Sequence, residues 1–129
     1  MRLLLDTHVA IWSLTAVHRL PVDIRQILAS RSNDVFVSAA SIWEIAIKFR
    51  LCRKDSPPFD AQEAIRHFTN VGYDFQDISI AHAAAVGHLH TTHADPFDRL
   101  LIAQAITEPL ILVTRDSKIA AYSPTFITW

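Results

Sequence analysis

The sequence HADPFDRLLIAQA, residues 93–105, carries the strongest local signals in the chain. Asp95 followed by Pro96 predicts the start of a helix, because aspartate is a favoured N-cap and proline fits the first helical position, where its missing N–H has no partner. Asp98 then falls at the third helical position, beside the positive end of the helix dipole. After Arg99 the helix is apolar on nearly every side, which predicts that it enters the core. Two carboxylates therefore stand at the start of a buried helix, where each is either a cap or part of a site.

The composition is typical of a globular protein, and we expect residues 1–129 to form a single domain. The chain is 50% hydrophobic and 19% charged, with 12 Lys and Arg against 13 Asp and Glu and a net charge of −1. This balance supports a sizeable core, excludes a disordered chain and leaves any polyanion partner to a local basic patch. Cys52 is the only cysteine, so no internal disulfide forms, and no apolar run is long enough for a signal peptide or a membrane span. We expect a cytoplasmic protein.

Short apolar strands alternate with helices along the chain. This alternation predicts an α/β fold with a mostly parallel sheet, covered by helices on both faces through right-handed crossovers. Strands are expected at 2–5, 35–37, 73–78, 110–113 and 126–127. Helices are expected at 9–14, 20–30, 39–49, 61–70, 79–86, 96–107 and 117–122.

Four acidic residues are expected to meet at one edge of this sheet. Asp6 and Asp116 follow strands directly, Glu44 lies in the helix after the second strand, and Asp98 opens the helix that leads to the last major strand. Groups that follow the carboxyl ends of parallel strands gather at one edge, which is where ligands bind in such folds. Capping alone explains Asp6 or Asp98 taken singly, but it does not explain four acids together.

Glu44 has two structural interpretations beside the functional one. Its spacing from Ser41 matches a capping box, and its spacing from Lys48 matches an i,i+4 ion pair. Its sequence neighbours are mostly apolar, however, and a carboxylate in such surroundings is costly to bury without a partner.

The chemistry of four clustered carboxylates indicates a metal site. Such groups repel each other and stay ionised only with a compensating cation, and hard oxygen ligands favour Mg²⁺ or Mn²⁺. These ions polarise a phosphate, lower the pKa of a bound water and stabilise the leaving oxygen. The acids therefore predict phosphodiester hydrolysis.

Two further groups of residues have open interpretations. The cations of residues 48–54 are either a solvated helix end, which suits the helix dipole, or contacts to RNA phosphates. The histidines that precede Asp95 resemble a zinc-ligand run of metallo-β-lactamase-like hydrolases, but that family needs further histidines downstream and the chain has none, so loop or surface histidines are favoured. The residues are Lys48, Arg50, Arg53 and Lys54 in the first group, and His88, His90 and His93 in the second.

Four segments resemble the PIN-domain family, and most closely the VapC-like toxin ribonucleases of prokaryotic toxin–antitoxin pairs. They are 4–8 (LLDTH), 38–45 (SAASIWEI), 93–105 and 112–116 (LVTRD). The resemblance implies an α/β/α sandwich and an endoribonuclease that depends on one or two Mg²⁺ or Mn²⁺ ions. It also implies a homodimer and a cognate antitoxin that blocks the acidic site. The implied metal ligands are Asp6, Glu44, Asp98 and Asp116; Asp95 is also acidic in relatives, and Thr114 corresponds to a polar position near the metal.

Our hypothesis from the sequence is a metal-dependent endoribonuclease in which a water molecule attacks the phosphorus. Two alternatives come from other classes of protein. A receiver-type phosphoacceptor domain has a similar length and an acidic edge, but it needs paired acids after its first strand, where this chain has Asp6, Thr7 and His8. A catalytically inactive RNA-binding PIN module is the other, and the intact set of four acids argues against it.

Overall fold

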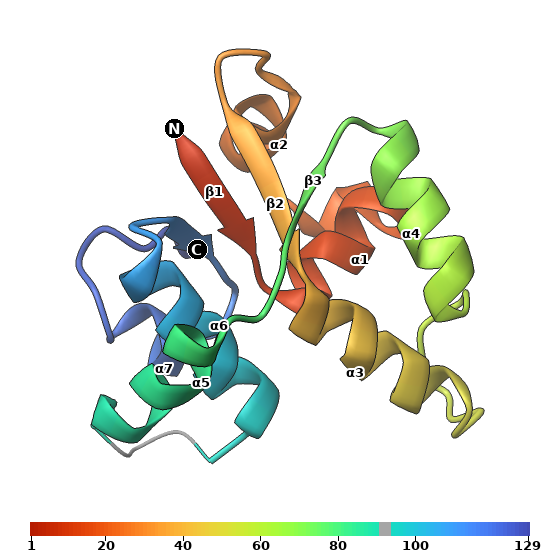
Figure 1. Cartoon of the computed structure of the whole chain (residues 1–129). Coiled ribbons are helices and arrows are strands. Elements are labelled where there is room, and N and C mark those ends of the chain that lie inside the picture. Colours follow the sequence, from red (N-terminus) through yellow and green to blue (C-terminus); the bar gives the residue numbers. More distant parts are fainter. Residues whose placement is uncertain (91–93) are drawn as a thin grey trace.

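The computed structural model describes residues 1–90 and 94–129 (Figure 1). In chain order its elements are β1 (Arg2–Leu5), α1 (Thr7–Thr15), the 3₁₀ helix η1 (Val17–Arg19), α2 (Val22–Ala29), β2 (Asp34–Ser38), α3 (Ala39–Phe49), α4 (Ala61–Asn70), β3 (Asp74–Gln76), α5 (Ile80–Ala85), the 3₁₀ helix η2 (Val86–His88), α6 (Pro96–Thr107), β4 (Ile111–Val113) and α7 (Ser117–Ala120).

The four strands form one parallel sheet in the order β3-β2-β1-β4. Leu5 of β1, in the centre, is paired with Val37 of β2 on one side and Val113 of β4 on the other. The chain runs outward from β1 to β3, then crosses back to place β4 on the far side of β1. Because crossovers between parallel strands are right-handed, this reversal moves the connecting helices to the opposite face of the sheet. The reversal point between β1 and β4 is where parallel α/β sheets bind ligands.

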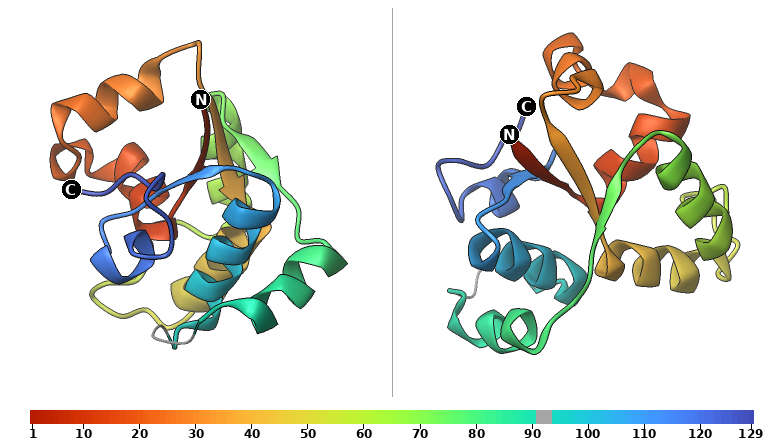
Figure 2. Two further views of the ribbon diagram at one scale, coloured as in Figure 1. Left: turned by 90° about the vertical axis from the view of Figure 1, so that its left-hand side faces the viewer. Right: turned by 45° about the horizontal axis from the view of Figure 1, so that its top comes forward.

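Each face of the sheet has its own hydrophobic core. Leu3 and Leu5 pack on one face with residues of α1, α2, α3 and α4, whereas Leu4 packs on the other with residues of α6 and α7. Neighbouring strand residues point to opposite faces, so β1 is buried on both sides. In Figure 2, α2 and α5 lie on opposite sides of the strands. The predicted α/β/α sandwich with a parallel sheet is therefore confirmed.

The start of α6 matches its sequence prediction. Asp95 is the N-cap, and its Oδ1 accepts the N–H groups of Phe97 at 2.9 Å and Asp98 at 3.2 Å, with Pro96 in the first turn. The helix then enters the core, since residues 101–105 are all buried. Asp98 is not the cap, because Asp95 already accepts its N–H.

Of the interpretations of Glu44, the structure excludes the capping box with Ser41. Ser38 is the N-cap of α3 and accepts the N–H of Ala40 at 2.9 Å, which leaves Ser41 inside the helix. The Ser41 hydroxyl is instead hydrogen-bonded to the Thr7 hydroxyl at 2.8 Å, so it joins α3 to α1.

Several predicted bounds differ from the structure. The helix expected at 20–30 is shorter and follows the 3₁₀ helix η1, because Pro21 occupies its N-cap position. The strand expected at 126–127 is reduced to one parallel bridge between Val113 and Ile127. None of the helices in the described ranges combines the length and the hydropathy that a membrane crossing requires.

The strand order also separates this chain from receiver-type domains. Their sheets have the order 2-1-3-4-5, in which the third strand lies beside the first. Here β3 lies beside β2, and β4 takes the place beside β1. The receiver alternative is therefore wrong at the level of topology.

Candidate functional site

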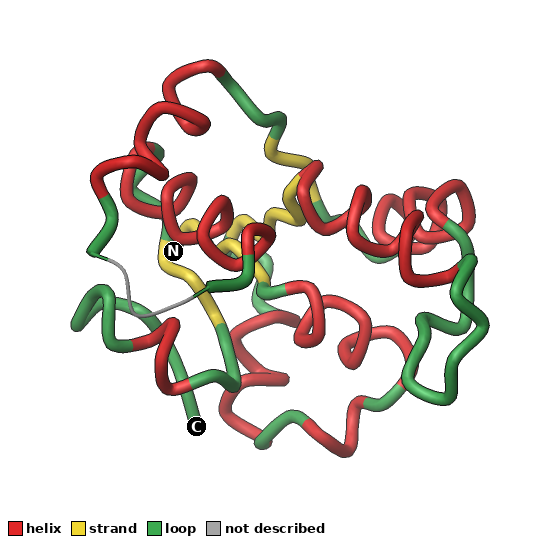
Figure 3. Tube along the Cα trace, turned by 90° about the horizontal axis from the view of Figure 1, so that it is seen from below, coloured by secondary structure: helices red, strands yellow, loops and turns green. Residues whose placement is uncertain are grey.

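The carboxyl ends of β1 and β4 lie side by side, and the acids that follow them are linked through Thr114. The Thr114 hydroxyl donates a hydrogen bond to Asp6 Oδ2 at 2.7 Å and accepts the N–H of Asp116 at 3.0 Å. The N–H of Asp6 in turn donates to the carbonyl of Val113 at 3.0 Å. Figure 3 views the molecule from this edge. The structure thus brings Asp6, Thr114 and Asp116 together at the reversal point of the sheet.

Asp6 is held as a carboxylate although it is only 4% exposed. Burial raises its pKa, but hydrogen bonds from His8 and Thr114 and the nearby imidazole lower the pKa more, so the net result is a pKa below the ordinary value. The hydrogen bond with Asp6 raises the pKa of His8, against the opposing effect of burial. His8 Nδ1 lies 3.8 Å from Asp6 Oδ1.

Glu44 is buried on α3, and only one of its two carboxylate oxygens has a partner among the described residues. Its side chain is 4% exposed, and Oε2 forms an ion pair with the Lys48 ammonium one turn further along the helix. The predicted i,i+4 pair is therefore confirmed. Oε1 is buried and has no hydrogen-bond partner within the described part of the chain. A buried carboxylate oxygen without a partner is costly in a folded protein.

The Lys48 ammonium lies in a field of several acids. Burial lowers its pKa, but the hydrogen bond to Glu44 and the charges of Glu44, Asp95 and Asp98 raise it, so the net result is a pKa above the ordinary value. The acids of α3 and of the start of α6 therefore surround one cation.

An aromatic contact joins the two helices that carry these acids. The Trp43 ring of α3 meets the Phe97 ring of α6 edge to face, with centroids 5.0 Å apart. Besides the hydrogen bond with Asp6, the charges of Asp6 and Glu44 raise the pKa of His8. Asp6 and Asp116 are thus linked through Thr114, and the ring contact joins the helices that carry Glu44 and Asp98. Whether the four acids form one site stays a prediction.

The side chains do not converge into a ready metal site. Within residues 1–90 and 94–129, no three His, Cys, Asp or Glu side chains are grouped closely enough to hold an ion. The histidine run remains unassembled in that part of the chain: His88 and His90 are exposed, and the His90 ring stacks on Tyr122 with centroids 4.4 Å apart. His93 lies outside the described residues.

The predicted basic residues divide into two kinds. Lys48 belongs to the acidic site through Glu44, whereas Arg50, Arg53 and Lys54 follow the end of α3 and are exposed. Arg53 and Lys54 line hollows beside the site. Whether these cations contact RNA stays a prediction.

Buried polar contacts that support the site were not foreseen. Gln104, fully buried on α6, accepts the Ser38 hydroxyl at 2.5 Å and donates to the carbonyl of Asp77 at 3.2 Å. Gln104 is a lone polar residue in an apolar helix, and this feature of the sequence could have indicated a buried polar contact. His82 Nε2 is 2.7 Å from Glu108 Oε1, and this pairing of distant residues has no sequence signal.

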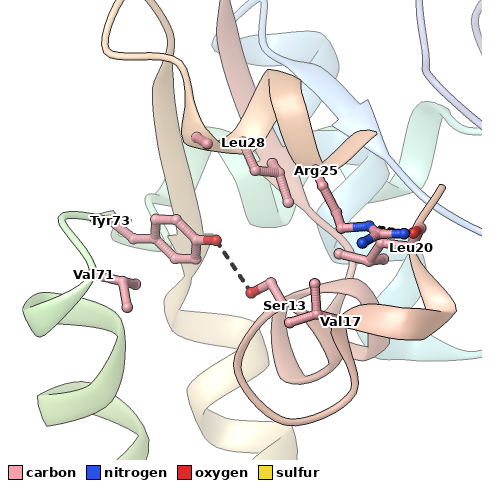
Figure 4. Close-up of a pocket in the computed structure, with 8 residues that line it drawn as sticks. Ser13, Val17, Leu20, Arg25, Leu28, Val71 and Tyr73 are labelled. Atoms are coloured by element: carbon pink, nitrogen blue, oxygen red, sulfur yellow. Dashed lines mark hydrogen bonds between the residues drawn. The ribbon is translucent and has the colours of Figure 1, made fainter. Parts of the chain in front are cut away.

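The apolar hollow of Figure 4 lies apart from the acids. It has a volume of about 340 Å³ and is lined by residues of α1, η1, α2 and 71–73. The Tyr73 hydroxyl donates to Ser13 Oγ there at 3.2 Å. It contains none of the four acids, so it is not part of the candidate site.

Comparisons with known proteins identify the family and the fold. The chain matches the PIN domain family over residues 3–123, and no match was found among curated proteins. Its fold is similar to VapBC2 from Rickettsia felis bound to a promoter DNA fragment, with a TM-score of 0.72, 20% identity and coverage of 100% of this chain and 98% of the other. It is also similar to DNA-bound VapBC from Salmonella typhimurium, with a TM-score of 0.71, 18% identity and coverage of 100% and 97%. For VapBC-1 from nontypeable Haemophilus influenzae the TM-score is 0.69 at 13% identity, with coverage of 100% and 97%. From the sequence match over nearly all of its length, together with the shared fold, the chain belongs to the PIN domain family.

Proposed function

We propose that the chain is a divalent-metal-dependent endoribonuclease in which Asp6, Glu44, Asp98 and Asp116 hold one or two Mg²⁺ or Mn²⁺ ions. The observation that carries the proposal is the buried Glu44 carboxylate, whose Oε1 has no hydrogen-bond partner among the described residues. A cation beside this oxygen would remove the cost of burying it. The Lys48 ammonium on Oε2 stands in for such a cation, and the all-oxygen donor set fits Mg²⁺ or Mn²⁺.

The residues around the acids have positioning roles in this proposal. Thr114 and the N–H of His8 hold Asp6 ionised and in one orientation. Asp95 caps α6 and so fixes the turn that carries Asp98. A bound ion would neutralise the carboxylates, polarise the phosphate and lower the pKa of an attacking water. In this proposal a water molecule, and not a protein side chain, is the nucleophile.

We further propose that the protein is the toxin of a toxin–antitoxin pair. The support is the fold shared with VapBC complexes and the PIN family match. In this proposal an antitoxin blocks the acidic edge, the toxin is a cytoplasmic homodimer, and residues 1–129 act as one nuclease domain. Purification with the protein encoded beside it tests the partnership: a stable complex without cleavage activity is expected, and two independent proteins would contradict it.

A cleavage assay tests the catalytic proposal. Purified protein is incubated with defined single-stranded RNA in Mg²⁺, in Mn²⁺ or in EDTA, and the product ends are determined. We expect cleavage only with a metal ion, leaving a 3′-hydroxyl and a 5′-phosphate. Asp6→Asn and Glu44→Gln are expected to abolish cleavage, whereas Asp23→Asn, which removes an exposed carboxylate on α2, is expected to leave it unchanged.

The outcomes separate the remaining hypotheses. Binding of RNA without cleavage under any metal condition would favour the inactive RNA-binding module. Cleavage that persists in EDTA, or in Glu44→Gln at the wild-type rate, would reject the metal site.

A further inference from the structure

Two adjoining hollows lie beside the acidic site, and together we call them the side groove. The larger has a volume of about 460 Å³ between α1, η1 and the loop 54–58, and the smaller has about 80 Å³ beside the end of α3. Both are lined by His8, Asp55 and Ser56, so they meet there. The smaller one reaches Lys48, which is paired with Glu44. The side groove therefore begins at Lys48, the partner of Glu44, and extends from there along α1.

Flat rings and a guanidinium are stacked at the far end of the side groove. The guanidinium carbon of Arg19 lies over the Trp12 ring, 5.2 Å from its centroid. The His8 ring lies one turn before Trp12 on α1, where the two hollows meet, with its centroid 6.0 Å from that of Trp12 and a tilt of 41°. Aromatic rings and guanidinium planes are surfaces on which nucleobases stack.

Cations line the same path between the rings and the acids. They are Lys48 and Arg53 in the smaller hollow and Lys54 and Arg19 in the larger, against the single carboxylate of Asp55. The chain as a whole has a net charge of −1. Because Lys48 is paired with Glu44, the other three cations against the one carboxylate are a local excess of positive charge. A groove that combines cations with stacking surfaces is the arrangement by which proteins bind single-stranded nucleic acid.

We propose that the side groove binds the RNA segment next to the scissile phosphate, with a base stacked at Trp12 and Arg19 and phosphates paired with Arg53 and Lys54. This inference rests on the proposed ribonuclease function and adds a binding groove for the nucleotides beside the cut. A base stacked in the groove is unpaired, because a duplex hides its base faces. The substrate is therefore single-stranded RNA that extends at least one nucleotide beyond the cut.

Binding is measured separately from cleavage. Short fluorescent single-stranded RNA is titrated against the Glu44→Gln protein in EDTA, with and without the added substitutions Arg19→Gln and Lys54→Gln. These side chains are both exposed, so the fold tolerates their loss. We expect binding to weaken by about 10-fold or more, since each stacked base is worth roughly 5- to 100-fold in affinity. The slope of log affinity against log salt is expected to decrease by about 0.7 for each lost phosphate contact.

A control variant and two substitutions of Trp12 test whether the loss of binding is specific to the side groove. Arg31→Gln removes an exposed cation in the turn before β2, at the opposite edge of the sheet, and is expected to bind RNA as the parent protein does. Trp12→Leu removes the ring while keeping an apolar side chain, and Trp12→Phe keeps a ring. We expect Leu to weaken binding and Phe to restore most of it, with thermal melts to verify folding.

The results also distinguish this inference from the proposed function. Wild-type cleavage combined with unchanged RNA affinity in the Arg19 and Trp12 variants would overturn the side groove and leave the ribonuclease intact. Variants that bind RNA normally but lose a co-purified protein partner would assign the groove to that partner and reject the inference. Equal affinity for single-stranded and fully duplex RNA would also reject it.

Discussion

Thr114 is a single residue on which two of the proposed metal ligands depend. Its hydroxyl donates to the buried Asp6 carboxylate and accepts the N–H of Asp116. Thr114→Val keeps the shape but removes both bonds, so we expect a loss of about 1–3 kcal/mol in the free energy of unfolding. Cleavage is expected to fall by roughly 10- to 100-fold, as for other residues that orient ligands. Thr114→Ser keeps the hydroxyl and should retain most activity; equal activity of the Val and Ser variants would contradict this role.

Tyr73 gives a prediction about alkaline pH. Burial raises the pKa of its phenol, and the hydrogen bond with Ser13 lowers it less, so the folded pKa lies above the unfolded value near 10. The neutral phenol is favoured in the folded state, so this contribution to stability is complete below about pH 10 and is lost as the pH rises through the folded pKa. Denaturant melts of Tyr73→Phe and wild type should therefore converge at high pH. A difference in stability that does not change with pH would exclude this linkage.

At the scale of elements, α3 carries a cation, Lys48, beside the carboxylate that is proposed to bind a metal ion. Lys48→Met removes it and leaves the buried Glu44 carboxylate without its partner. We expect a loss of about 1–2 kcal/mol without metal, less than the roughly 3–5 kcal/mol of a fully buried pair, because the Lys48 side chain is 40% exposed and screened by solvent. Thermal melts should show Mg²⁺ or Mn²⁺ stabilising this variant more than the wild type. Arg66→Met, which removes an exposed cation on α4, is the control. If the metal ion raises the melting temperature of all three proteins equally, Lys48 and the metal do not both stabilise the Glu44 carboxylate.

The placement of α6 depends on Gln104, which joins it to the end of β2 and to the segment before α5. Gln104→Leu keeps an apolar helix but leaves the Ser38 hydroxyl and the Asp77 carbonyl without their partner. We expect unfolding free energy to fall by about 1–3 kcal/mol. Cleavage should also decrease, since α6 carries Asp98. Gln62→Leu on the exposed side of α4 should change stability by about 0.5 kcal/mol or less, and a similar small effect at Gln104 would show that the bridge is unimportant.

These elements also indicate which features a sequence predicts well. The start of α6 was predictable because a cap acts within three residues of its own position, as at Asp95. The capping-box interpretation of Ser41 failed because Ser38 caps α3, and that depends on where β2 ends. Contacts between distant residues, such as Thr7 with Ser41 or His82 with Glu108, leave no periodic signal and become visible only in the fold.

At the scale of the whole molecule, the strand order determines where the acids meet. Alternation of strands and helices predicted a parallel sheet and its acidic edge, but it does not specify which strand lies beside β1. The observed order puts β4 there, and with it Thr114 and Asp116 next to Asp6. The same order excludes the receiver topology, which shares the alternation. The fold class can thus be predicted from local sequence patterns. The reversal point that forms the site depends on which distant strands pair.

The proposed toxin function makes a prediction for the living cell. A ribonuclease with an intact acidic site should arrest growth when its antitoxin is missing, so induced expression of the wild-type chain alone should stop growth in a bacterial host. Glu44→Gln removes the charge but keeps the size of the side chain, and we expect normal growth at equal protein levels. Asp23→Asn should be as harmful as the wild type, because that exposed carboxylate on α2 is not part of the proposed site. Expression of the protein encoded beside the toxin should restore growth. The argument from shared fold to toxicity is an analogy, so equal growth of the wild-type and Glu44→Gln strains, with both proteins verified by immunoblot, would reject the toxin proposal even if the purified protein cleaves RNA.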